Sequence, residues 1–271
     1  MVRLAATVML VRPAGEAGFE VFMLRRSEAS HFVPDVYVFP GGVLDTADYS
    51  ERALARARGV DDASLSRQFR AEIVPSFPAP FSSPSKCEAA GLLIAAVREL
   101  YEEAGVLLAC DGDGSPLSDR DLAPHRKALH DARARVQSGE LPFAGLLESV
   151  GAYANAGALF LFSQWITPPQ FPRRYNAHFF LAQACADQAA VADAFETHDG
   201  VWIAPKAALE RCSAGTFRMV YPTVKHVERL AQFDRLDDLF AFARTKPIYS
   251  IMPDTPGERE FSMPPDLEYA W

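Results

Sequence analysis

A short charged segment near the middle of the chain has the residue types that a divalent cation needs. It reads Arg98-Glu99-Leu100-Tyr101-Glu102-Glu103. On a helix, Glu99, Glu102 and Glu103 lie on one face, because residues three and four positions apart are neighbours there. Mg²⁺ prefers oxygen ligands and bridges to substrate phosphates. Glutamates on a solvated helix face are common, so the spacing alone fits either a metal site or an ordinary surface.

The segment ends a strongly amphipathic stretch, which predicts a helix from Glu88 to Ala104. Apolar residues recur there at spacings of three and four positions. They are Leu92, Leu93, Ala96, Val97, Leu100 and Ala104. Gly105 follows, at the position after a helix end where glycine is favoured. The apolar face would pack on a core, and the glutamates would point away from it.

The charged segment resembles the second half of the Nudix box, R-E-U-x-E-E-x-G-U, in which U is aliphatic. The matching positions are Arg98, Glu99, Leu100, Glu102, Glu103, Gly105 and Val106. Upstream, Phe39-Pro40-Gly41-Gly42 matches the F-P-G-G that precedes the box in many Nudix hydrolases. This resemblance implies the Nudix fold, of the α/β (α+β) class, with a mixed β-sheet sandwiched between helices. It also implies a Mg²⁺-dependent enzyme, with Mn²⁺ as the alternative metal, that cleaves a diphosphate bond in a nucleotide-containing small molecule.

The first half of the box is interrupted. The family pattern G-x5-E-x7-R-E, counted from Gly42, would place the arginine at position 56, but it stands at Arg98, 42 residues later. We therefore expect an inserted segment inside the box. The glutamate expected eight positions before Arg98 is replaced by Ala90. Glu88 and Asp45 are the two alternatives for its bracing role, and the sequence does not choose between them.

Residues upstream of the glycines favour coenzyme A as the substrate. In the coenzyme A diphosphatase branch of the family, a signature with arginine and serine precedes F-P-G-G, and Arg26 and Ser27 match it. His31 replaces the second arginine of the signature and Asp35 replaces its glycine, so the signature is partly kept. The interrupted box is also similar to that of the peroxisomal type of these enzymes. The expected products are 3′,5′-ADP and 4′-phosphopantetheine or its acyl form.

Two alternatives stay open beside coenzyme A. One is another nucleoside diphosphate derivative, such as ADP-ribose, NADH or a dinucleoside polyphosphate. The other is a catalytically silent Nudix module that only binds a nucleotide. The intact set of three glutamates argues against the silent module, because carboxylates that hold a metal are what such a module loses.

The resemblance assigns a role to each candidate residue. The candidate catalytic residues are Arg98, Glu99, Glu102, Glu103 and Glu196, the metal ligands among them are Glu99, Glu102 and Glu103, and the substrate-binding residues are Arg26, Ser27, Gly41 and Gly42. Arg98 would pair with a carboxylate of the box, and Glu196 would be a further acidic ligand or base. A guanidinium group binds phosphate through two parallel N–H donors. Glycines allow backbone N–H groups to approach anionic oxygens closely.

One large domain is expected to hold all these residues. It would span residues 1–244, with a helical insertion at about 46–87, helices at 118–138 and 222–244, and an extended, proline-containing tail at 245–271. Strands are expected at 4–11, 19–24, 36–39, 159–166, 177–184 and 202–203. The insertion or the tail would cap the site or form a homodimer contact, and the sequence does not say which.

Composition excludes several other classes of protein. The net charge is −8 and the pI is about 5.3, and an acidic chain lacks the basic footprint that nucleic-acid binding requires. No apolar run approaches the roughly 18 residues of a membrane span, and no secretory signal precedes the first expected strand. The four cysteines form no C-x-x-C pair, which is typical of reduced thiols in a cytoplasmic protein.

Overall fold

The computed structural model describes most of the chain. The described residues are 2–15, 18–26, 35–69, 71–72, 83–184, 190, 197–255, 260–268 and 270–271. Of the helices in these ranges, none combines the length and the apolar character needed to cross a membrane.

A mixed β-sheet forms the centre of the molecule, in the order β11-β2-β1-β10-β9-β12-β6, with β3 paired to β2 and β4 paired to β1. Its strands are β1 (Val2–Pro13), β2 (Phe19–Arg26), β3 (Tyr37–Val38), β4 (Gly41–Val43), β6 (Ala71–Glu72), β9 (Phe160–Ile166), β10 (Arg174–Gln183), β11 (Thr197–Ile203) and β12 (Ile248–Ile251). Strand β1 pairs in parallel with β10 and antiparallel with β2 and β4, so the sheet is mixed as predicted.

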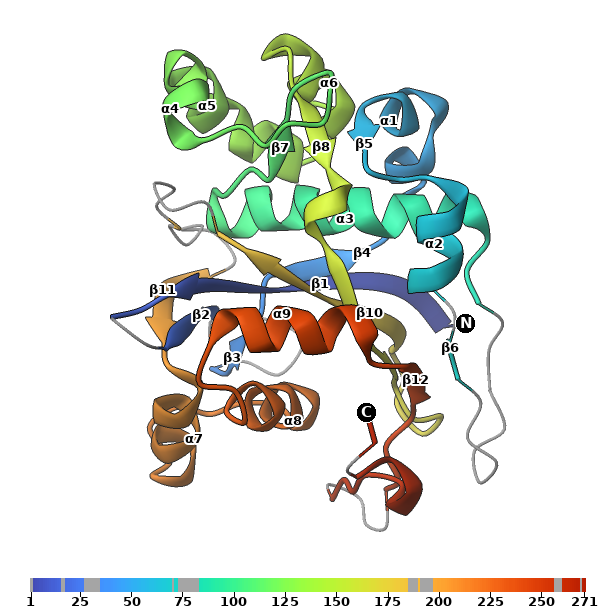
Figure 1. The fold of residues 1–271 in the computed structure, drawn as a ribbon, viewed down its shortest axis with the longest axis vertical. Coiled ribbons are helices and arrows are strands. Elements are labelled where there is room, and N and C mark those ends of the chain that lie inside the picture. Colours follow the sequence, from blue (N-terminus) through green and yellow to red (C-terminus); the bar gives the residue numbers. More distant parts are fainter. Residues whose placement is uncertain are drawn as a thin grey trace.

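Helices cover both faces of this sheet (Figure 1). Helix α3 (Lys86–Ala104) lies on one face, and α7 (Pro205–Ser213), α8 (Tyr221–Leu230) and α9 (Leu236–Thr245) lie on the other. Helix α3 begins where Ser85 and Glu88 form a reciprocal capping box, two residues earlier than predicted. It ends at Gly105, which adopts the left-handed conformation at φ 68° that glycine tolerates best.

An outer layer lies over α3, so this helix is buried between two layers (Figure 1). The layer contains a small sheet in the order β5-β8-β7. Its elements are η1 (Thr46–Tyr49), α1 (Glu51–Ala55), β5 (Ala57–Arg58), α2 (Asp62–Gln68), β7 (Ala109–Cys110), α4 (Asp119–Leu122), η2 (Ala123–His125), α5 (Arg126–Gln137), α6 (Phe143–Ser149), β8 (Tyr153–Asn155) and η3 (Ala156–Ala158). In the described residues, the helical character predicted for the insertion at about 46–87 and for 118–138 is thus present as several short helices.

The segment after α9 is part of the main sheet. Strand β12 pairs in parallel with β9, and η4 (Pro265–Leu267) follows it. The last residue, Trp271, is only 2% exposed and contacts the rings of Phe162 and Trp165 edge to face. Apolar burial therefore fixes a segment whose prolines alone suggested an extended tail.

Candidate active site

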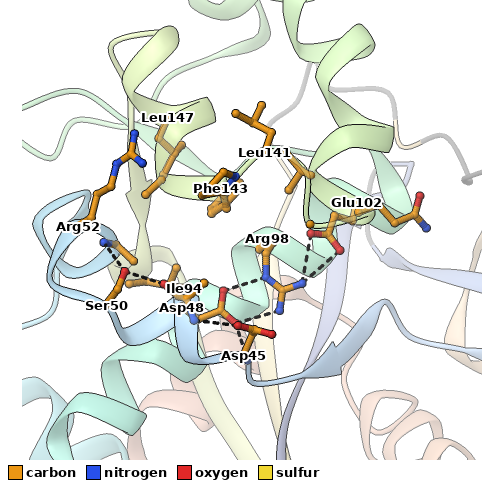
Figure 2. Close-up of a pocket in the computed structure, with 17 residues that line it drawn as sticks. Asp45, Asp48, Ser50, Arg52, Ile94, Arg98, Glu102, Leu141, Phe143 and Leu147 are labelled. Atoms are coloured by element: carbon orange, nitrogen blue, oxygen red, sulfur yellow. Dashed lines mark hydrogen bonds and ion pairs between the residues drawn. The ribbon is translucent and has the colours of Figure 1, made fainter.

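Helix α3 presents a buried cluster of opposite charges where it faces η1 and β4. Arg98 donates from Nε and Nη2 to the carboxylate of Asp48 at 2.8 and 2.9 Å. Its Nη1 donates to Glu99 Oε1 at 2.8 Å and to both oxygens of Glu102 at 3.2 Å. A further bond at 3.2 Å reaches the carbonyl of Val43 in β4. One guanidinium therefore joins the helix, the loop and the sheet, as Figure 2 shows for Asp48 and Glu102.

The two glycines of β4 let the helix carboxylates approach the strand. The backbone N–H of Gly41 donates to Glu103 Oε2 at 2.8 Å. At Gly42, an added Cβ would lie 2.3 Å from Glu99 Oε1, so any larger residue would displace that carboxylate. At Gly41, an added Cβ would lie 2.4 Å from the carbonyl oxygen of Ala6 in β1. Both glycines thus allow close packing between β4 and its neighbours in the chain itself, and their predicted role in substrate binding stays a prediction.

Negative charge dominates this group, which we call the acidic cluster: Asp48, Arg98, Glu99, Glu102 and Glu103. Three carboxylates, those of Asp48, Glu99 and Glu102, pair with one guanidinium, and Glu103 accepts from Gly41 instead; the five residues together carry a net charge of −3 when all are ionised. Burial raises the pKa of Glu99 to about 7, and the nearby Glu102 charge adds to this, although Arg98 opposes it. Burial alone would lower the pKa of Arg98, but hydrogen bonding to Asp48 and the surrounding carboxylates hold it above its ordinary value.

The donor set suits a hard divalent cation. The oxygens are carboxylates on one face of a helix, the oxygen ligands that Mg²⁺ prefers. Asp48, Glu99 and Glu102 are buried, and a buried carboxylate favours a cation nearby. Among the described residues, however, no three acidic, histidine or cysteine side chains are already gathered in a form that could hold a metal. Glu99 and Glu102 turn toward Arg98, and Glu103 toward Gly41. Binding a cation would require these carboxylates to exchange their present partners for the metal.

Asp48 is the residue that braces Arg98, and the sequence analysis missed it. Glu88 instead caps the start of α3, where it accepts from the Ser85 N–H at 2.8 Å. Asp45 caps η1 by accepting from the N–H of Ala47 at 2.8 Å. Counting backward from Arg98 gave Ala90, because the insertion lies between the two halves of the box. Counting forward from Gly42 by the family spacing reaches Asp48, a buried aspartate in place of the glutamate.

Helix α5 supplies Arg133, a second supporting residue of the site that no sequence pattern indicated. Arg133 donates from Nε to the backbone carbonyl of Glu102 at 2.7 Å. The last carbonyls of a helix have no partner within the helix, so this bond completes the end of α3. The Tyr101 hydroxyl donates to the carbonyl of Leu129, which ties the same turn to α5 again. The turn that carries Glu102 and Glu103 is therefore held from outside the box.

Two neighbouring arginines at the end of β2 lie on opposite faces of the sheet. Side chains alternate along a strand; Leu24 packs in the core beneath α3, and Met23 packs in the core on the α8 side. Arg26 therefore projects toward the face that carries α3, and Arg25 toward the other. Arg25 donates from Nε to Asp35 Oδ1 at 2.8 Å. The alternation therefore directs Arg26, which the sequence pattern selected, to the face of the sheet opposite that of Arg25.

Two predicted site residues cannot be placed. Ser27 and Glu196 lie outside the described residues, as does His31 of the partly kept signature. The described ends of their segments are Arg26 in β2 and Thr197 in β11, whose backbones pair with each other. Their predicted roles in substrate binding and catalysis stay predictions.

Comparison with known proteins gives matches over most of the chain. The family model described as the NUDT19 Nudix domain matches residues 1–230. The acyl-coenzyme A diphosphatase NUDT19 of Gallus gallus is 30% identical over an alignment of 253 residues, which covers 85% of this chain and 66% of that protein. The protein of the same name from Homo sapiens is 31% identical, over 85% of this chain and 65% of that protein. The chain thus spans slightly less than two thirds of the length of these relatives.

A solved structure supports the fold. The crystal structure of a NUDIX hydrolase from Alicyclobacillus acidocaldarius superposes with a TM-score of 0.62, at 22% identity, and covers 92% of this chain and 97% of that one. At this identity the similarity concerns the fold alone. It confirms the predicted mixed sheet between helices.

Proposed function

The chain belongs to the Nudix family, in the group described by the NUDT19 Nudix domain, and from that premise we propose that it is a Mg²⁺-dependent hydrolase of coenzyme A or acyl-coenzyme A. The reaction adds water across the P–O–P bridge. One phosphorus gains the water oxygen, the bridging oxygen leaves with the other phosphorus, and the products are 3′,5′-ADP and (acyl-)4′-phosphopantetheine. The matched relatives carry the name of this activity.

The observation that carries the proposal is the acidic cluster between α3 and β4. Glu99, Glu102 and Glu103 are the residues that would hold the cation. A divalent cation bound there supplies positive charge against the diphosphate oxygens. Arg98 holds the carboxylates of Glu99 and Glu102, and Asp48 fixes Arg98 in turn. Mn²⁺ has the same preference for oxygen ligands, so we propose it as the alternative metal.

Arg26 is our proposed anchor for the phosphorylated nucleotide end of the substrate. It lies at the end of β2, on the face of the sheet that carries α3. Its guanidinium suits the 3′-phosphate, which a planar pair of N–H donors binds well. We propose that Ser27 assists there and that Glu196 is an additional acidic ligand or base.

We also propose a refined position for the insertion. With Asp48 in the register of the first box glutamate, the 42 extra residues fall between Asp48 and Arg98. The domain would then resume with α3, and the insertion would contribute α1, β5 and α2 to the outer layer.

Product analysis tests the proposal directly. Purified protein with Mg²⁺ is incubated with coenzyme A, acyl-coenzyme A, ADP-ribose, NADH and a dinucleoside polyphosphate, and the products are separated by chromatography. We expect 3′,5′-ADP from coenzyme A, and none when Mg²⁺ is removed by chelation. Release of AMP from ADP-ribose, without any 3′,5′-ADP from coenzyme A, would overturn the substrate assignment. No hydrolysis of any compound would overturn the enzymatic function.

A further inference from the structure

A cavity of about 320 Å³ opens beside the acidic cluster, on the side of α3 that faces the outer layer. Asp48, Arg98 and Glu102 line one side of it, and Leu141, Phe143 and Leu147 line the opposite side (Figure 2). The insertion contributes Ser50, Arg52 and Ala53 to its wall. The cavity is thus polar next to the proposed metal ligands and apolar farther away.

The size of the cavity limits what it can hold. Ligand pockets usually enclose about 300–1,000 Å³, so this one, at about 320 Å³, lies at the small end of that range. It is large enough for one arm of a substrate such as coenzyme A and too small for the whole molecule. One arm would enter the cavity, and the other would extend elsewhere from the scissile bridge.

Charge decides which arm fits. Among the described residues that line the cavity, the two basic ones are both paired with carboxylates. Arg98 is bound within the acidic cluster, and Arg52 donates to Glu148 at 2.9 and 2.5 Å. The remaining charged residues of the lining, Asp45, Asp48 and Glu102, are acidic. Such a lining repels the 3′-phosphate of the nucleotide arm and accepts a neutral chain of amides and methylenes.

Resting on the proposed function, we propose that this cavity binds the pantetheine arm of the substrate and that the box insertion is therefore a specificity element. The nucleotide arm then lies on the opposite side of the carboxylate turn, toward Arg26. Because Glu102 lines the cavity and belongs to the acidic cluster, the phosphate end of the pantetheine arm is next to the proposed metal ligands. The apolar side formed by Leu141, Phe143 and Leu147 receives the chain.

Filling the cavity from two different helices tests this assignment. Ala144 in α6 and Ala53 in α1 both line it and are buried, so Ala144→Leu and Ala53→Leu each reduce its volume. The readouts are the inhibition constants of the two products, 4′-phosphopantetheine and 3′,5′-ADP. We expect each variant to raise the constant for 4′-phosphopantetheine about tenfold, as extra methylenes do in a close-fitting pocket, and to leave that for 3′,5′-ADP unchanged. Arg26→Ala should do the reverse.

A matched control uses a second cavity of similar size, about 310 Å³, lined by Ala158, Phe160 and Phe240 among others. Ala158→Leu fills that cavity and should change neither inhibition constant. A wild-type enzyme that cleaves coenzyme A, with 4′-phosphopantetheine inhibition unaffected by both filling variants, overturns the inference and leaves the proposed function standing. A wild-type enzyme that neither cleaves coenzyme A nor is inhibited by either product overturns the proposed function itself.

Hydrogen exchange keeps the inference testable if both filling variants fail to fold. Adding 4′-phosphopantetheine to the wild-type protein should slow backbone exchange in α1 and α6, which line the cavity, and 3′,5′-ADP should not. Equal protection by both products, or protection by neither at saturation, contradicts the assignment of the cavity.

Discussion

The two faces of the main sheet bury polar groups in opposite ways. On the α3 face, the acidic cluster holds four carboxylates and one guanidinium. On the other face, His226 stacks on Phe179 with ring centroids 4.0 Å apart. Its Nδ1 lies 2.6 Å from the carbonyl of Pro222, so this nitrogen donates, and Nε2 accepts from the Ser163 hydroxyl at 2.6 Å. We call this second group, with Lys246 and Trp271, the aromatic cluster.

The two clusters differ in how their charged side chains are compensated and in whether they border a cavity. In the aromatic cluster, Lys246 donates to the carbonyl of Phe162 and its ammonium lies 4.6 Å from the Phe162 ring centroid, so its charge has a carbonyl and an aromatic face as partners. Burial lowers the pKa of Lys246 to about 7, which favours its neutral form. The acidic cluster contains four carboxylates and one guanidinium, and Asp48, Arg98 and Glu102 of this cluster line an open cavity. We infer that the aromatic cluster stabilises the fold and that the acidic cluster receives a ligand.

The largest expected effect is a loss of turnover when the acidic cluster, but not the aromatic cluster, is altered. Glu102→Gln keeps the shape of the side chain and removes its charge, so coenzyme A hydrolysis should fall on the order of a thousandfold. The control is Lys246→Met in the aromatic cluster, which should leave turnover unchanged. Rates of 3′,5′-ADP release at saturating Mg²⁺ measure both. Wild-type turnover in Glu102→Gln would mean that the acidic cluster is as structural as the aromatic one.

A large effect on stability is expected at Asp48. Removing one partner of a buried ion pair strands the other charge, so Asp48→Ala should lower the free energy of unfolding by about 3 kcal/mol. Asp45→Ala, three residues earlier, removes only the cap of η1 and should cost about 1 kcal/mol. Urea denaturation measures both. Equal losses of unfolding free energy in the two variants would show that Asp48 is not needed to compensate the buried charge of Arg98.

A smaller effect is expected at Arg133, which we consider a positioning residue. Arg133→Ala frees the carbonyl of Glu102, and kcat should fall about tenfold, the usual scale for groups that orient metal ligands. The KM for coenzyme A should not change, and Arg133→Lys should recover part of the loss. Arg135→Ala, on the same helix but paired with Glu140 at the surface, is the matched control. A rise in KM without loss of kcat would instead place Arg133 in substrate binding.

The smallest effect is a difference in pH response. The pKa of Glu99 is raised to about 7 from its ordinary 4.5, so its contribution to stability is present below pH 4.5 and is lost as the pH rises through about 7. Burial lowers the pKa of His226 to about 3 from 6.5, so its contribution is present above pH 6.5 and is lost as the pH falls toward about 3.

Thermal unfolding at two pH values measures this difference. Mg²⁺ competes with the proton at the acidic cluster, so it should raise Tm by a few degrees more at about pH 8 than at about pH 5.5. The additional shift should disappear in Glu102→Gln and persist in Lys246→Met. An equal Mg²⁺ shift at both pH values would disconnect the metal from these carboxylates.

Local patterns in the sequence predicted the parts of the fold that depend on local interactions. The apolar spacing located α3 to within two residues, and Gly105 marked its end. Strands β1 and β2 are longer than predicted by a few residues, because Arg12 and Arg26 continue the ladders although they are charged. The segment after α9 was harder to predict, because contacts with residues distant in the chain fix it, among them the pairing of β12 with β9 and the burial of Trp271.

The candidate site likewise contains residues that local spacing predicts and residues that only long-range folding brings in. Glu99, Glu102 and Glu103 share a helix, so their spacing predicted a common face, but it could not predict that Glu99 and Glu102 turn to Arg98 and Glu103 to Gly41. Asp48 lies 50 positions from Arg98 along the chain, and its partner is visible only once the insertion has folded over α3. Arg133 comes from a helix that carries no motif, and no periodicity could assign its bond to Glu102.

Anomalous scattering from Mn²⁺ tests the central claim most directly. Crystals of the protein would be soaked in Mn²⁺ with coenzyme A, and the map would be calculated at the manganese absorption edge. We expect a peak in contact with the carboxylate oxygens of Glu99, Glu102 and Glu103, with Glu102 turned away from Arg98. A peak elsewhere, with Glu102 still bound to Arg98 and Glu103 still bound to Gly41, would contradict the assignment of these glutamates as the metal site.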